Sequence, residues 1–123
     1  MELFIKLLIG LVAAFHCYIF WFEMFAWTTV GARVFKKLPK ELFPPTKGLA
    51  ANQGLYNGFL AAGLIWTFFI QNTEWRSNIV VFFLSCVVVA GIYGAVTADK
   101  KIFFTQGLPA LVALLLVIIE KIR

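Results

Sequence analysis

Four runs of apolar residues divide the 123-residue chain, with short polar stretches between them. Each run approaches the ~20 residues that a helix needs to cross a bilayer. The pattern therefore predicts an all-α integral membrane protein, a four-helix bundle with up-down topology in a single domain, residues 1–123. The predicted spans are residues 3–30, 49–71, 78–98 and 102–119, with a basic loop at residues 31–48.

Composition and charge support this reading and suggest an orientation. The chain is 62% hydrophobic and only 14% charged, against about 25% charged residues in soluble proteins. Seven of the eleven basic residues lie in residues 33–47 and 100–101. Cytoplasmic loops hold the Lys/Arg excess, so both connections should face the cytoplasm of an inner (plasma) membrane and both termini should lie outside. The basic residues left outside weaken this bias: Lys6, Arg76, Lys121 and Arg123.

The expected partner is the lipid bilayer. No aromatic and basic surface of the kind that binds nucleic acid is visible in the sequence. Trp21 and Trp27 are predicted to contact lipid or to anchor the first span at the interface. In the second span, Gly54, Gly58 and Ala62 recur every four residues, and such small-residue faces allow close helix contact.

Two ionisable residues stand out in the first span, where unpartnered charge is costly. His16 and Glu23 lie on one stripe of the helix, seven residues or about 10 Å apart, which is too far for both to ligate one metal ion. Ligation of haem by two histidines would need two subunits, because His16 is the only histidine. No metal or cofactor is therefore expected.

The polar residues are predicted to lie at similar depths below the cytoplasmic surface of the membrane, which indicates one shared site. Counting from the nearest cytoplasmic charge, Glu23 and Asn57 each lie about 15 Å deep. The other polar side chains also fall in the cytoplasmic half, so one inward-opening pocket is expected. Glu23 is the candidate catalytic residue, with His16 as the floor of the pocket. The candidate ligand-binding residues are Asn52, Gln53, Tyr56, Asn57, Tyr93, Thr97 and Gln106.

These residues also carry a resemblance to a known family. The motifs are His16 with Glu-Met-Phe-Ala-Trp from Glu23, the string Ala-Asn-Gln-Gly-Leu-Tyr-Asn-Gly in the second span, Tyr93-Gly with Thr97, and Gln-Gly-Leu-Pro-Ala from Gln106. Together they resemble the small bacterial four-helix membrane proteins of the domain-of-unknown-function family numbered thirteen hundred and four. The resemblance covers essentially the whole chain. It implies a four-span inner-membrane protein and no particular activity.

Three functions fit the pattern, and they leave open whether the protein is an enzyme. The first is a pocket that binds or transforms a small lipophilic molecule, with Glu23 as acid or base and the amides polarising an oxygen. The second is a proton-coupled transporter, which would need access from both sides and usually a homodimer. The third is a structural or regulatory membrane protein whose polar cluster only locks the helices together.

Overall fold

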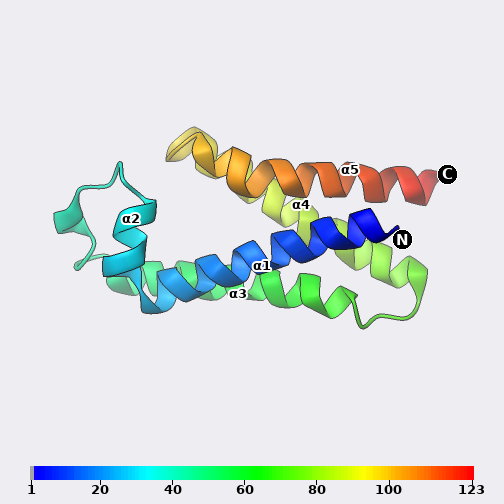
Figure 1. Ribbon diagram of the computed structural model, residues 1–123, viewed down its shortest axis with the longest axis horizontal. Coiled ribbons are helices and arrows are strands. Elements are labelled where there is room, and N and C mark those ends of the chain that lie inside the picture. Colours follow the sequence, from blue (N-terminus) through cyan, green and yellow to red (C-terminus); the bar gives the residue numbers. More distant parts are fainter. Residues whose placement is uncertain (1) are drawn as a thin grey trace. The chain divides into compact units, whose positions relative to one another are not determined.

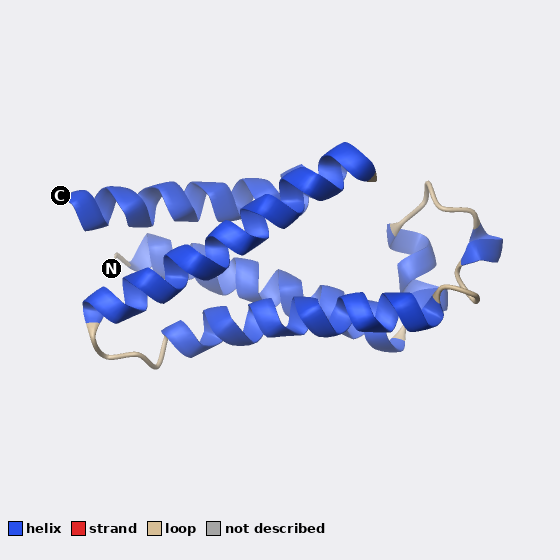
Figure 2. Ribbon diagram, turned by 180° about the vertical axis from the view of Figure 1, so that it is seen from behind, coloured by secondary structure: helices blue, strands red, loops and turns tan. Residues whose placement is uncertain are grey.

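The computed structural model describes residues 2–123, and every regular element in that range is helical (Figures 1 and 2). This confirms the predicted all-α fold class. The α-helices are α1 (Leu3–Phe25), α2 (Ala32–Val34), α3 (Lys47–Thr67), α4 (Thr73–Thr97) and α5 (Leu108–Ile122). Irregular helical turns occupy Trp27–Gly31 and Phe103–Gly107, where the backbone is π-helical, and Lys40–Leu42, a short 3-10 turn.

Within the part of the chain that the structure describes, three helices are long and apolar enough to cross a membrane: Leu3–Phe25, Thr73–Thr97 and Phe103–Ile122. The chain is thus a helical, membrane-like protein with three qualifying spans rather than the predicted four. The exception is α3, whose 21 residues give about 30 Å of helix, enough length for a bilayer. Its first half carries the amides and Lys47, which lower its hydropathy.

Two predicted boundaries differ from those observed. The first span was expected to continue to residue 30, but α1 ends at Phe25 because Ala26 leaves the helical region with φ −139° and ψ 35°. A turn was expected at residues 72–77, yet α4 begins at Thr73, and the connection lies at residues 68–72. Asn72 caps α4, since its side-chain oxygen accepts a hydrogen bond from the Trp75 N–H at 2.9 Å.

The chain divides into two compact units by its internal contacts. The first unit contains residues 1–15 and 60–123 and therefore α4, α5 and the adjoining ends of α1 and α3. Its core is aliphatic, as the apolar pattern of these helices predicts. The buried residues of that core are Ile5, Ile9, Val12, Ala13, Leu64, Val80, Leu84, Val87, Val88, Ala110, Ala113 and Val117.

A close approach of two glycines shapes the first unit. A Cβ atom on Gly91 of α4 would lie 2.7 Å from Cα of Gly107, so neither helix tolerates a side chain there. On the same helix, Ala90 and Ala98 are exposed, whereas a Cβ on Gly94 would lie 2.9 Å from the Ile102 side chain. The turn Phe103–Gly107 lies directly before the first turn of α5, which contains Pro109. Proline cannot donate its backbone hydrogen bond, which is consistent with the irregular helical turn before it.

The second unit, His16–Phe59, contains the end of α1, the basic loop and the first half of α3. Its helices approach closely at the small-residue face predicted for the second span. A Cβ on Gly54 would lie 3.1 Å from the backbone oxygen of Phe20, and one on Gly58 would lie 2.9 Å from the Phe20 ring. The prediction is confirmed for these two glycines, whereas Ala62 is exposed.

Candidate functional site

Glu23 lies in the second unit, where α1 and α3 are in close contact. Glu23 is only 9% exposed. A Cβ built on Gly54 would lie 3.0 Å from the Cβ of Glu23. The absence of a side chain at Gly54 is therefore what allows α3 to pack against the carboxylate-bearing turn of α1. A carboxylate in such an apolar setting is costly unless polar groups contact it.

Asn57 supplies such a group from the next turn of α3. Its side-chain nitrogen Nδ2 donates a hydrogen bond to Oε1 of Glu23 at 2.7 Å. The same amide donates to the backbone oxygen of Gln53 at 3.1 Å, which fixes its direction. Within residues 2–123, no other side chain hydrogen-bonds to the Glu23 carboxylate. Because a carboxylate offers about four acceptor positions, this arrangement orients Glu23 and leaves it able to accept further donors.

The other polar residues of α3 do not gather around Glu23 in the way the sequence suggested. Asn52, Gln53 and Tyr56 are exposed, whereas Asn57 is half-buried. Tyr56 packs edge-on against Phe59, with ring centroids 5.9 Å apart. These side chains therefore form a polar outer surface of the helix that bears Asn57.

His16 is fully buried in α1, with 1% exposure. It is two turns from Glu23 along the helix, so one small ligand group does not contact both side chains directly. Within residues 2–123, no three His, Cys, Asp or Glu side chains gather in the way a metal ion would require.

The remaining predicted site residues belong to the first unit. Tyr93 and Thr97 are exposed on α4, and the Thr97 hydroxyl donates to the Tyr93 backbone oxygen at 2.7 Å. Gln106 is half-buried in the π-helical turn before α5. Their participation in one site with Glu23 stays a prediction.

Trp27 has a role that sequence reasoning missed. It was expected to contact lipid or to anchor at the interface, but it is only 9% exposed. Its indole Nε1 donates to Oγ1 of Thr46 at 3.0 Å. Its ring lies 4.9 Å from that of Phe43 and 5.6 Å from that of Phe35. The basic loop is thus a folded cap over Trp27, and the phenylalanines spaced among its lysines were the signal for it.

The motifs around this site also identify the family. The family described as "Protein of unknown function (DUF1304)" matches residues 10–118, nearly the whole chain. The chain belongs to this family. The match confirms the resemblance seen in the sequence motifs and, like it, brings no activity.

This DUF1304 chain is similar in sequence to the "Uncharacterized protein YpaA" of Lactococcus lactis subsp. lactis (strain IL1403). The two are 36% identical over 107 residues, which cover 85% of this chain and 88% of the relative. No solved structure is significantly similar to the chain. The function must therefore be argued from the chain's own residues.

Proposed function

We propose that this DUF1304 protein binds a small lipophilic molecule beside Glu23, within the membrane. The observation that carries the proposal is the 2.7 Å hydrogen bond from Asn57 to Glu23. It orients one carboxylate oxygen and leaves the remaining acceptor positions for a ligand. An oriented carboxylate in apolar surroundings binds a hydroxyl, amine or other hydrogen-bond donor more strongly than it would in water.

The chemistry available to such a ligand follows from the groups present. Glu23 can accept a proton or a hydrogen bond, and a positioned carboxyl group is a common general acid or base. The amides and the phenol on the outer surface of α3, at Asn52, Gln53 and Tyr56, offer further polar contacts at the approach to this helix. We therefore place the ligand's polar group at Glu23 and its apolar part among the surrounding aromatic side chains.

A structural role is the competing explanation, and the same hydrogen bond favours it. Glu23 and Asn57 join α1 to α3 next to the close approach at Gly54. Hydrogen bonds between membrane helices contribute about 0.6 kcal/mol on average. A helix lock of this kind would need no ligand and no proton transfer.

The substitution Glu23→Gln separates the two explanations. Glutamine keeps an oxygen that can accept the Asn57 hydrogen bond but removes the charge. Glu41→Gln is the matched control, since Glu41 is exposed in the basic loop of the same unit. The measurement is mass spectrometry of the lipophilic molecules that co-purify with each variant from the membrane.

We expect one co-purifying molecule to fall about tenfold or more in Glu23→Gln, because hydrogen bonds to charged groups contribute about 1.5–3 kcal/mol. Its amount should be unchanged in Glu41→Gln. Equal amounts of every molecule in all three proteins, with unchanged thermal stability, would overturn the proposal and leave the helix lock as the role of Glu23.

A further inference from the structure

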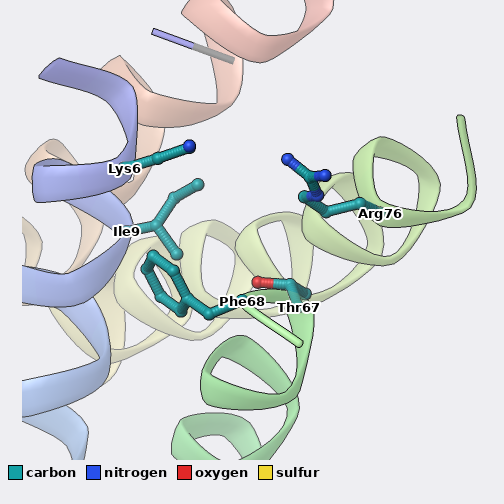
Figure 3. A pocket seen from close by; sticks show the side chains of 5 residues that line it. All are labelled: Lys6, Ile9, Thr67, Phe68 and Arg76. Carbon is teal, nitrogen blue, oxygen red and sulfur yellow. The ribbon is translucent and has the colours of Figure 1, made fainter. Parts of the chain in front are cut away.

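A cavity of about 160 Å³ lies in the first unit, apart from the Glu23 site. Its lining comes from the beginning of α1, the end of α3 and the first turn of α4: Lys6, Ile9, Thr67, Phe68 and Arg76. Figure 3 shows the cationic ends of Lys6 and Arg76 directed toward each other over the side chains of Ile9 and Phe68. For scale, a cavity of about 150 Å³ admits a benzene-sized molecule.

The two cations are not neutralised by the protein. No carboxylate lines the cavity, and within residues 2–123 neither Lys6 nor Arg76 forms an ion pair. Glu2 and Glu74 are close to Lys6 and Arg76 in the chain, but neither contributes to the lining. Two like charges that face one cavity repel each other. An anion between them would turn this repulsion into two favourable contacts.

Arg76 is held in place for such a role. Its Nε donates to the Ile70 backbone oxygen at 3.0 Å, and its Nη2 donates to that of Gln71 at 3.4 Å. These bonds tie the guanidinium to the connection between α3 and α4 and leave the other N–H groups available. Lys6 is exposed, so the cavity is accessible from the surface at that side.

We propose that this cavity binds a phosphate group. Arg and Lys are the residues that bind phosphate, Arg through its planar array of donors and Lys as a point charge. Ile9 and Phe68 supply an apolar floor suited to the carbon atoms next to a phosphate ester. Lys6 and Arg76 each lie within about one turn of a helix end, where the long side chains of Lys and Arg in membrane helices reach the level of the lipid head groups.

The proposal also accounts for a feature of the charge pattern. Lys6 and Arg76 are on the predicted outer side, where the positive-inside bias gives no reason for basic residues. The same phosphate chemistry has two sources, the head group of an anionic phospholipid and free inorganic phosphate. The test therefore has one arm for each.

The first arm measures retention of phosphatidylglycerol and of phosphatidylcholine by the full chain, using native mass spectrometry from mixed micelles. We expect preferential retention of phosphatidylglycerol, reduced about fivefold by Lys6→Gln, which corresponds to one near-surface basic residue. Lys121→Gln is the matched control, because Lys121 is an exposed lysine of the same unit that contacts Asn78 and does not line the cavity.

The second arm adds inorganic phosphate, with sulfate-free chloride buffer of equal ionic strength as the reference. Free phosphate is the source if it raises the thermal stability of the wild type but not of Lys6→Gln, with no preference for phosphatidylglycerol. Identical binding in Lys6→Gln and Lys121→Gln in both arms would overturn the proposal.

Discussion

At the residue scale, burial decided which polar and aromatic side chains act together. Glu23 and Asn57 were each predicted as site residues, but their pairing at 2.7 Å follows from the contact of two helices. Trp27 shows the reverse case. A tryptophan at the end of an apolar run commonly marks an interface, yet here it is buried because Phe43 and Thr46, far along the chain, cover it.

The hydrogen bond of Trp27 gives a prediction at this scale. Trp27→Phe keeps an aromatic ring against Phe43 but removes the Nε1 donor to Thr46. We expect a loss of about 1 kcal/mol in the free energy of unfolding, measured by thermal unfolding in detergent.

Trp21→Phe is the control for this change, since Trp21 is 47% exposed in α1. Trp27→Phe and Thr46→Val each remove the hydrogen bond between these two side chains. Its contribution to stability should therefore be lost only once in the double variant. Equal stability of Trp27→Phe and Trp21→Phe would contradict the role of the indole.

At the element scale, the spacing of glycines predicted a helix contact correctly, whereas the apolar pattern did not predict where the first helix ends. The four-residue recurrence of Gly54 and Gly58 predicted a close helix contact on this face, and the structure shows that α1 is the partner. The end of α1 was missed because residues 26–30, Ala-Trp-Thr-Thr-Val, carry no charge, glycine or proline to mark a helix end. Nothing in these residue types signals the change of backbone direction at Ala26.

Alanine at two glycines of α3 tests this contact. A Cβ on Gly54 would lie 3.1 Å from the backbone nitrogen of Met24 and the backbone oxygen of Phe20, which cannot rotate away. Gly54→Ala should therefore cost about 1–3 kcal/mol from overpacking. The measurement is again thermal unfolding in detergent.

Gly48→Ala is the internal control. Gly48 lies in the same helix, and a Cβ built there would have nothing within 4 Å. Alanine is a better helix former than glycine, so Gly48→Ala should be neutral or slightly stabilising. If both substitutions had the same effect, close packing at Gly54 would not be the reason for its glycine.

At the scale of the whole molecule, the number of spans is the question on which topology depends. Three helices qualify by length and hydropathy, and α3 has the length without the hydropathy. The amides that lower its hydropathy lie in its first half. The side-chain amide of Asn57 donates a hydrogen bond to Glu23. Residues 58–67 are apolar apart from Thr67, whose hydroxyl donates to the Leu64 backbone oxygen at 2.6 Å.

The two span counts predict different placements of the termini. Four spans put both ends on one side of the membrane, whereas three spans put them on opposite sides. We expect both ends outside, because the second half of α3 is apolar with its Thr67 hydroxyl paired, and because the basic loops favour the cytoplasm.

Reporter fusions at each end, one active only in the cytoplasm and one active only outside it, measure this directly. A fusion within the basic loop at residues 36–37 supplies the cytoplasmic reference. Opposite placement of the two termini would show that α3 does not cross.

The sequence by itself determined the helical class, the membrane character, the family and the identity of Glu23 as the exceptional carboxylate. The family follows from short sequence motifs, and the other three follow from local composition and periodicity, which each helix carries alone. Only the tertiary structure decided that Asn57 contacts Glu23, that Trp27 is covered by the loop, and that Lys6 and Arg76 share a cavity. The two hydrogen bonds and the pairing of Lys6 with Arg76 join residues at least nineteen positions apart. They depend on how close two backbones come, which periodicity does not encode.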